Sequence, residues 1–300
     1  MVNQEIVVPA AETDKKLQSF LKSRFPIGYV RKVFRNNGLR VNGKRSKPED
    51  LVRAGDRIQL YIPFEKTVRH RDAPSVAAPK FPVIYEDTQL LVINKPAGVA
   101  VHEGKHVLKR HSVIGALERT YREQGVRLQL VHRLDKDTSG VLLIAKDELT
   151  AAALEAIFAE GREADKEYLC LVAGRLQDNQ GRIDLALPGR EGAPVRALTR
   201  FKVLERFSQT TLTRVNIETG RLHQIRLHFA ALGYPVVLDD QHGDFNFNKR
   251  FSKKYGLKRQ FLHARHLEIE HGGKKYVWSA QIPKDLQYVL DALRSEEKHR

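Results

Sequence analysis

The feature that most limits how this chain can fold is a polar segment that leads straight into an apolar one. His132-Arg133-Leu134-Asp135 precedes Thr138-Ser139-Gly140, which predicts a turn, and the run Val141 to Ala145 predicts a buried β-strand. Ionisable groups beside a buried strand are costly unless they have a use. The segment alone leaves two interpretations open. It is either a solvated loop in which Asp135 or Asp137 caps a turn, or part of a functional site.

Length and composition indicate a soluble globular protein of about two domains. The 300 residues are 41% hydrophobic and 29% charged, which is ordinary for such proteins. We expect no membrane segment, because no apolar run approaches the roughly 20 residues that span a bilayer. Met1 to Asp14 lacks the basic and apolar stretches of a signal peptide. The single cysteine, Cys170, lies in an apolar run, which predicts a core thiol in a reducing compartment and hence a cytoplasmic protein.

The net charge is the strongest global indication of a partner. The chain has 52 Lys and Arg against 36 Asp and Glu, which leaves +16 at neutral pH. A surplus of this size favours a polyanion such as nucleic acid, through phosphate contacts and the release of counterions. A basic protein without such a partner is the alternative that charge by itself leaves open.

Half of this surplus lies in residues 1 to 70, which hold 15 Lys and Arg against seven Asp and Glu. Apolar spacing predicts two short helices there, over residues 15–24 and 29–36. Asn42-Gly43 predicts a hairpin turn, and a further strand is expected over residues 57–62. The segment Val41 to Arg45, followed by Gly55-Asp56, resembles the S4 RNA-binding module. The resemblance implies an RNA-binding domain over residues 1–66, with these cations on RNA: Arg31, Lys32, Arg35, Lys44 and Arg45. A solvated charged face is the alternative.

The rest of the chain mixes hairpins and helices without regular βαβ alternation. We expect residues 67–80, which contain Pro and no apolar periodicity, to be a linker before a catalytic domain over residues 81–296. Its predicted fold class is α+β, with a mainly antiparallel mixed sheet flanked by helices and loops. Strands are expected at 83–85, 90–93, 141–145, 166–172, 197–203, 210–218, 265–269 and 276–280. Helices are expected at 112–122, at 147–160, and from the segment 219–226 through residue 232.

Residues 249–259 carry six basic side chains and no acidic one. Phe251 and Tyr255 interleave with them, and basic and aromatic residues together suit phosphate contact and base stacking. We therefore predict RNA contacts from three of these cations: Arg250, Lys253 and Lys254. An exposed loop with solubilising charge is the alternative.

Several kinds of chemistry can be weighed for Asp135. A phosphatase of the aspartyl-phosphate type needs its Asp-x-Asp-x-Thr motif after a strand, and here the strand follows. A glycosidase needs two carboxylates, and Asp137 is expected to point away. A metal site needs several ligands, whereas this loop holds Arg and Lys. His102 and His106 lack an acidic or cysteine partner, so we predict no metal site there either. What remains is one carboxylate among cations, acting as nucleophile or ionised stabiliser.

Two long motifs resemble the RluA-type pseudouridine synthases. The first is His132 to Asp135 with Thr138-Ser139-Gly140, and the second is Thr219-Gly220-Arg221-Leu222-His223-Gln224-Ile225-Arg226. Shorter segments fall in the family's order: Asn94-Lys95-Pro96 through Gly98, Lys166-x-Tyr168, and Phe261-Leu262-His263-Ala264. The chain is therefore identified as a member of this family over residues 80 to 290.

The resemblance implies that Asp135 attacks a uridine in RNA, after which the glycosidic bond breaks and the ring rejoins through C5. Arg226 matches the family's arginine partner of the aspartate, and a bidentate contact would hold the carboxylate. Tyr168 matches the active-site tyrosine, which stacks on the base and is the candidate for removing the C5 proton. Arg133 resembles the residue that fills the gap left by the extruded nucleotide. The remaining expectations are that His132 shapes the loop and that Ile225 and Leu262 line the pocket.

The resemblance also bears on cofactors and substrate. No cofactor is expected, because the reaction is an isomerisation. Within the family the chain is most similar to enzymes of the large ribosomal subunit, so 23S ribosomal RNA or an assembly intermediate is the predicted partner. His242 departs from the usual tyrosine, and Leu238 stands where small or aromatic residues are frequent. Transfer RNA as substrate and a non-catalytic ribosome-assembly role remain open, and a monomer is assumed.

Overall fold

The computed structural model describes residues 4–25, 27–62, 81–103, 108–160, 164–189 and 193–298. The chain forms two compact units, Met1–Val76 and Ala77–Arg300, and each is described by itself. The predicted linker, residues 67–80, lies outside the described residues.

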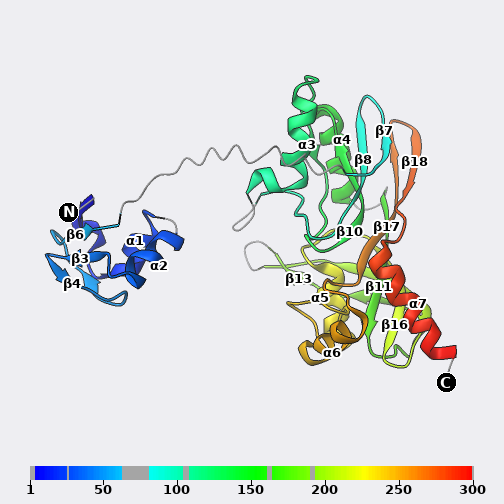
Figure 1. Cartoon of the computed structure of the whole chain (residues 1–300). Coiled ribbons are helices and arrows are strands. Elements are labelled where there is room, and N and C mark those ends of the chain that lie inside the picture. The colour runs from blue at the N-terminus through cyan, green and yellow to red at the C-terminus, as the bar shows by residue number, and fades with distance from the viewer. Residues whose placement is uncertain are drawn as a thin grey trace. The chain divides into compact units, whose positions relative to one another are not determined.

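The smaller unit contains a four-stranded sheet, two α-helices and a short 3-10 helix (Figure 1). The sheet order is β1-β6-β3-β4, and β2 pairs with β5 beside it. The strands are β1 Gln4–Val7, β2 Lys15–Lys16, β3 Leu39–Val41, β4 Lys44–Arg45, β5 Leu51–Val52 and β6 Arg57–Leu60. The helices are η1 Ala10–Glu12, α1 Leu17–Lys22 and α2 Ile27–Arg35. Leu17, Phe20 and Leu21 enter the core of this unit, as the helical spacing predicts.

The Asn42-Gly43 turn joins β3 and β4 as predicted. Both residues have positive φ, 51° and 78°, which is the backbone of the two-residue turns that suit the twist of a hairpin. The Asn42 side chain donates to Asp56 and accepts from the backbone of Arg57, at 2.8 Å each. The turn is thereby tied to the loop that contains Gly55-Asp56.

The larger unit is built on a ten-stranded mixed sheet with the order β12-β15-β16-β11-β17-β10-β8-β7, in which β18 also pairs with β17 and β9 with β10. The first strands are β7 Val83–Glu86, β8 Leu90–Lys95, β9 Gln129–Leu130, β10 Ser139–Ala145 and β11 Ala164–Ala173. The later ones are β12 Gln180–Asp184, β15 Leu198–Arg206, β16 Thr210–Ile217, β17 Leu262–His271 and β18 Lys274–Ser279. A separate ribbon pairs β13 Leu187–Pro188 with β14 Pro194–Val195. Among the described strands, every pairing is antiparallel except that of β10 with β17, so the predicted α+β class and mainly antiparallel sheet are confirmed.

The strand β10 is buried on both faces, which explains its unbroken apolar sequence. Leu142 and Ile144 enter one core cluster, while Val141, Leu143 and Ala145 enter another. The strand begins earlier than predicted, because Ser139 and Gly140 pair with β17 and are not turn residues. A Cβ on Gly140, whose φ is +122°, would lie 2.0 Å from the carbonyl oxygen of Ala264. Only glycine therefore allows β10 and β17 to meet directly after the Asp135 loop.

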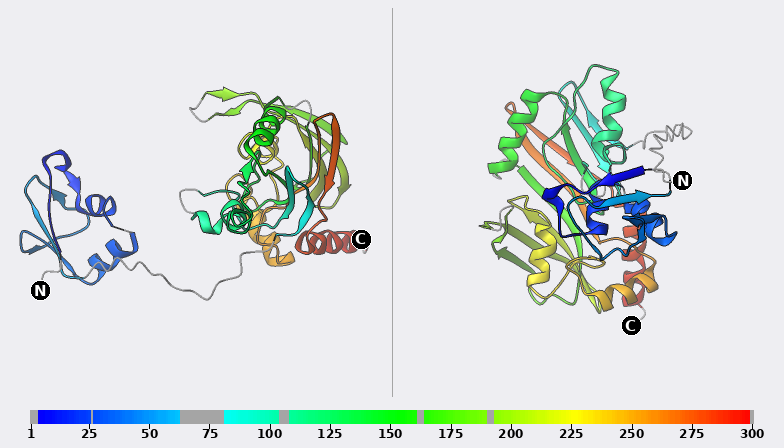
Figure 2. Two further views of the ribbon diagram at one scale, coloured as in Figure 1. Left: turned by 90° about the horizontal axis from the view of Figure 1, so that it is seen from above. Right: turned by 90° about the vertical axis from the view of Figure 1, so that its left-hand side faces the viewer.

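The helices of the larger unit lie around this sheet (Figures 1 and 2). They are η2 Lys109–His111, α3 Val113–Arg122, α4 Glu148–Glu160, α5 Gln224–Ala231, α6 Phe245–Tyr255 and α7 Lys284–Lys298. In both figures α3 and α4 lie at one end of the unit, and α5 and α6 lie at the other. β11 and β17, which run between them, carry residues of the central core.

The basic segment 249–259 differs from its prediction. It lies mostly within α6, which Asp244 caps at its start and Gly256 ends in a left-handed conformation. Phe251 is buried in a core cluster, and the Tyr255 hydroxyl donates to Glu296. Phe251 is therefore not available to stack on RNA bases, because a helix of this spacing turns it inward, whereas stacking by Tyr255 stays a prediction.

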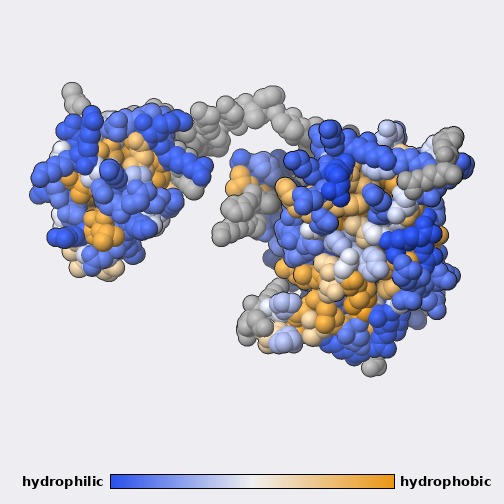
Figure 3. Space-filling model, turned by 90° about the horizontal axis from the view of Figure 1, so that it is seen from below, coloured by the Kyte–Doolittle hydropathy of each residue, from blue (hydrophilic) through white to orange (hydrophobic). Residues whose placement is uncertain are grey.

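The surface is mainly polar. On the face seen in Figure 3, hydrophilic residues predominate on each unit, with apolar patches between them. Among the described residues, no helix is long and apolar enough to cross a membrane.

Candidate active site

The Asp135 loop is fixed on three sides before β10 begins. The backbone N–H of Thr138 donates to the Asp135 carbonyl at 3.1 Å, so Lys136 and Asp137 form a turn. The Thr138 hydroxyl accepts from Gln260 at 2.7 Å. The assignment of Asp137 to a turn agrees with this geometry, and the Asp135 side chain is 18% exposed.

The buried side chain of Lys95 also holds the Asp135 loop, through hydrogen bonds to backbone carbonyls. Its side chain is fully buried, and its ammonium group donates to the carbonyls of Pro96, Val99 and Lys136 at 2.8–3.0 Å. Burial lowers the pKa of Lys95 to about 7, and the charges of Asp137 and Asp135 oppose that shift. Three acceptors match the three donors of an ammonium group, so the geometry favours the charged form. The sequence placed Lys95 in a motif without giving it this role.

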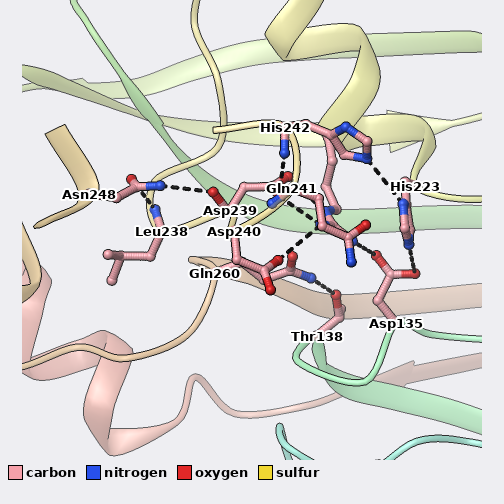
Figure 4. A network of polar contacts seen from close by, with 11 residues as sticks. Asp135, Thr138, His223, Leu238, Asp239, Asp240, Gln241, His242, Asn248 and Gln260 are labelled. Carbon is pink, nitrogen blue, oxygen red and sulfur yellow. Dashed lines mark hydrogen bonds and ion pairs between the residues drawn. The ribbon is translucent and has the colours of Figure 1, made fainter. Parts of the chain in front are cut away.

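Arg226, on α5, connects Asp135 to a second carboxylate (Figure 4). Its Nη1 donates to Asp135 Oδ2 at 3.0 Å, whereas Nε and Nη2 donate to Asp239 at 2.7 and 2.6 Å. Burial alone would lower the pKa of Arg226, but its bonds and charges with Asp239 and Asp135 raise it. The expected bidentate contact with Asp135 is therefore wrong: the bidentate partner is Asp239, and Asp135 receives one bond.

Asp239 is held as firmly as the arginine. Its side chain is fully buried, and Oδ1 also accepts from the backbone N–H groups of Gln241 and His242 at 2.9 and 3.0 Å. Burial would raise the pKa of Asp239, but the hydrogen bonds from Arg226 and these amides outweigh it and lower that pKa. The ionised Asp239 carboxylate thus holds Arg226 in the position from which it donates to Asp135.

Two histidines lie on the other side of the Asp135 carboxylate. His223 Nε2 is 3.9 Å from Asp135 Oδ1, and His223 Nδ1 is 3.1 Å from His242 Nε2 (Figure 4). His223 has φ +54°, an uncommon conformation for a residue with a side chain, directly before α5. Burial lowers the pKa of His223, as do Arg226 and His242, while Asp135 raises it. His242, the departure from the usual tyrosine, is thus linked to Asp135 through His223.

A cavity of about 280 Å³ opens beside Asp135. This volume lies near the lower end for small-ligand pockets. It is lined by all six residues that the sequence proposed for catalysis, flipping and the pocket: Asp135, Tyr168, Arg226, Arg133, Ile225 and Leu262. Arg133 is exposed at this cavity, whereas Ile225 and Leu262 are buried in its wall.

Tyr168 lies on β11 with its side chain 8% exposed. Burial and then the charge of Asp135 raise its pKa well above the ordinary value for tyrosine. Its hydroxyl makes no hydrogen bond to any residue that the structure describes. The resting site therefore holds a neutral phenol beside the carboxylate.

His132 takes a structural position. Its Nε2 accepts from the backbone N–H of Leu143 at 2.8 Å, and its ring stacks on Phe158. Burial, and then the charge of Lys166, lowers the pKa of His132 to about 3. The His132 ring is thus neutral and accepts a hydrogen bond from β10, which agrees with the expectation that His132 shapes the loop.

The cations predicted for RNA contact divide into two groups. Arg31, Lys32, Arg35, Lys44 and Arg45 are exposed on the smaller unit and have no ion-pair partner among the described residues. On α6, Arg250 and Lys253 are exposed, but Lys254 pairs with Glu296 at 2.7 Å.

The described residues contain no group of three or more His, Cys, Asp or Glu side chains that could hold a metal ion. His102 is described, whereas His106 lies outside the described residues.

Comparison with known proteins identifies the family of this chain. The family model of RNA pseudouridylate synthases matches residues 89–231. The ribosomal large subunit pseudouridine synthase C of Salmonella typhi is 37% identical over 97% of each chain. That of Escherichia coli K12 is 36% identical over 97% of this chain and 96% of its own. The chain belongs to the RNA pseudouridylate synthase family. The fold agrees with human RNA pseudouridylate synthase domain containing 4, at a TM-score of 0.60 and 24% identity over 71% of this chain and 93% of the other.

Sequence reasoning missed three residues that support the site of this pseudouridylate synthase. Gln224 bonds Thr219 and the backbone of Arg221 through its oxygen, and Leu198 and Thr199 through its nitrogen. Asp239 anchors Arg226, and Gln260 anchors Thr138. Gln224 lies inside the second motif, and Asp239 follows Leu238 directly in the chain. Nothing local in the sequence distinguished Gln260.

Proposed function

We propose that this enzyme converts uridines of the large-subunit ribosomal RNA to pseudouridine, with Asp135 as the catalytic carboxylate. The observation that carries the proposal is the contact of Asp135 with Arg226 at the edge of the cavity. A guanidinium beside a carboxylate favours its ionised form, and attack requires that form at neutral pH. The reaction moves the ribose link from N1 to C5 of the same base, so it requires no group donor or cofactor.

Tyr168 is proposed to stack on the base and then to take the C5 proton. A neutral phenol is a poor base, and its raised pKa depends partly on the charge of Asp135. Once Asp135 has formed a bond to the nucleotide, that negative charge is lost. The pKa of Tyr168 then falls, so its hydroxyl gives up its own proton to solvent more readily after the attack than before it, and the resulting phenolate can take the C5 proton.

Arg133 is proposed to occupy the space that the flipped nucleotide leaves, because it is exposed at the cavity and lies two residues before Asp135 in the chain. Ile225 and Leu262 are proposed to pack against the base. The exposed cations of the smaller unit, which we propose to be an S4-like domain over residues 1–66, would supply sequence-independent phosphate contacts. Arg250 and Lys253 are proposed to add to them.

The ribosomal substrate rests on similarity. The relatives that match nearly the whole chain are named as synthases of the large ribosomal subunit, and the charge of +16 suits a large structured RNA. We propose that the protein acts in the cytoplasm, as a monomer, on 23S ribosomal RNA or on an assembly intermediate that contains it.

The test maps pseudouridines in total RNA from cells that carry the wild-type chain, no chain, or Asp135→Asn. We expect specific sites in 23S ribosomal RNA to depend on the wild-type chain. We expect Asp135→Asn to lose at least about a thousandfold in turnover while it still binds RNA, since loss of a nucleophile costs at least this much in other enzymes. Full activity of the variant would refute the catalytic assignment. Loss of transfer RNA sites alone would move the substrate to transfer RNA.

A further inference from the structure

Lys166 is a buried cation at the cavity that the proposed reaction does not use. It lies on β11, two residues before Tyr168, and its residue is 6% exposed. Its ammonium group has no hydrogen bond or ion pair with any described residue. Among the described residues, the ammonium group instead contacts the ring of Phe158, whose centroid is 5.5 Å away. Both Lys166 and Phe158 line the cavity beside Asp135.

A cation in this position is costly to the free protein. Burial lowers the pKa of Lys166 to about 8, against the opposing charge of Asp165, so the side chain is still mostly charged at neutral pH. Contact with an aromatic ring offsets only part of the lost hydration. Another buried lysine, Lys95, makes up for its lost hydration with hydrogen bonds from its ammonium group to three carbonyls. Lys166 has no such partners among the described residues, and its position at the cavity leaves room for a ligand to supply them.

The chemistry of an RNA substrate identifies that ligand. Near neutral pH the only anionic groups of RNA are its phosphodiesters. Two residues of a strand span about 7 Å, so a base that stacks on Tyr168 can have its own or a neighbouring phosphate near Lys166. A compact ammonium group suits a single phosphate oxygen. We propose that Lys166 binds the phosphodiester next to the uridine that enters the cavity, and this inference rests on the proposed function.

The alternative is that Lys166 only supports the fold through Phe158, and the two roles predict opposite effects on stability. If Lys166 stabilises the free protein, its substitution should lower the stability of the free protein. A buried cation that waits for an anion destabilises the free protein, so Lys166→Met should leave the melting temperature unchanged or raised. The matched control is Lys202→Met, which removes an exposed strand lysine on β15.

The experiment uses the full chain and an RNA hairpin that contains a uridine mapped as above. Lys166→Met is expected to weaken binding of this hairpin by at least about tenfold, as loss of a charge-assisted hydrogen bond does. Lys202→Met should change it by less than about threefold. The second probe replaces the phosphodiester on the 5′ or the 3′ side of the uridine with a neutral methylphosphonate. One of the two replacements should weaken binding to the wild-type protein by a similar factor.

The decisive comparison combines both changes. If Lys166 contacts that phosphate, the methylphosphonate adds little to the loss already caused by Lys166→Met. Additive losses, unchanged binding by Lys166→Met, or a lower melting temperature with unchanged binding would each overturn the inference. Failure of the proposed function is separate, because the wild-type protein would then modify no uridine in the mapping experiment.

Discussion

At the scale of single residues, the two sides of Asp135 receive different partners. Arg226 donates to Oδ2, whereas His223 faces Oδ1 at 3.9 Å. A carboxylate favours a proton on His223 Nε2, which leaves Nδ1 as an acceptor. His242 Nε2, at 3.1 Å, must then be the donor. In this assignment His242 favours the tautomer of His223 whose Nε2 proton faces the Asp135 carboxylate, and the hydrogen positions are assigned from this network of contacts.

We predict that His242→Leu lowers kcat by about tenfold, because His223 loses the donor that fixes its tautomer and a hydrogen bond contributes about 1 kcal/mol. His242→Gln should stay within about threefold of the wild type, since its amide nitrogen can donate from a position close to Nε2. The measurement is single-turnover formation of pseudouridine on saturating RNA. Equal losses in the two variants would show that His242 acts through packing instead.

At the scale of elements, α6 supports the site indirectly, through the turn that contains Leu238 and Asp239. Asn248 accepts from the backbone N–H of Leu238 at 2.7 Å and donates to the carbonyl of Asp239 at 2.8 Å (Figure 4). Leu238 has φ +61°, a strained conformation for a leucine. The helix thus holds a strained turn that positions Asp239, which in turn fixes Arg226 against Asp135. The unusual Leu238 has its explanation in this turn, which Asn248 stabilises.

We predict that Asn248→Ala lowers the free energy of unfolding by about 1–3 kcal/mol, because it leaves two backbone groups without partners. It should also lower kcat by about three- to tenfold, because Arg226 loses a fixed support. Asn246→Ala is the control, since Asn246 is exposed on the same helix. Chemical denaturation and single-turnover kinetics give the two quantities. An Asn248→Ala variant that matches the control in both would refute this connection.

At the scale of the whole molecule, charge is distributed unevenly between two units. Residues 1 to 70 hold about half of the net charge of +16, and their unit has its own core. The catalytic unit carries the cavity and the remaining charge. RNA affinity and chemistry are thus expected to be separable.

We predict that deletion of residues 1 to 70 weakens RNA binding and flattens its salt dependence. If the five exposed cations each contact a phosphate, the magnitude of the slope of log affinity against log salt should fall by about 3.5 to 4.5. The matched variant keeps the full chain and changes Arg31, Lys32, Arg35, Lys44 and Arg45 to Gln. It should reproduce the smaller slope without loss of the unit. An unchanged slope in both would show that the catalytic unit alone makes the phosphate contacts.

Local sequence patterns were sufficient to predict much of the fold and of the candidate site. The apolar run after Asp135 predicted β10, the Asn42-Gly43 pair predicted the hairpin turn, and the spacing of Leu17, Phe20 and Leu21 predicted α1. The motifs identified the family, and all six proposed site residues line one cavity. The helix α6 was not predicted, because the charge of the segment 249–259 concealed a helical pattern in which Phe251 faces inward.

Local sequence patterns were enough to predict most of the backbone elements, the family and the types of side chain near Asp135. Only the tertiary structure decided which groups meet there: that Arg226 grips Asp239 with two bonds and Asp135 with one, and that Lys95 has three partners while Lys166 has none among the described residues. The reason is physical. Secondary structure follows from neighbours a few residues apart, whereas burial and hydrogen-bond partners depend on how distant segments pack. Asp135 and Arg226 are 91 residues apart in the chain, and no local pattern encodes the single bond between them.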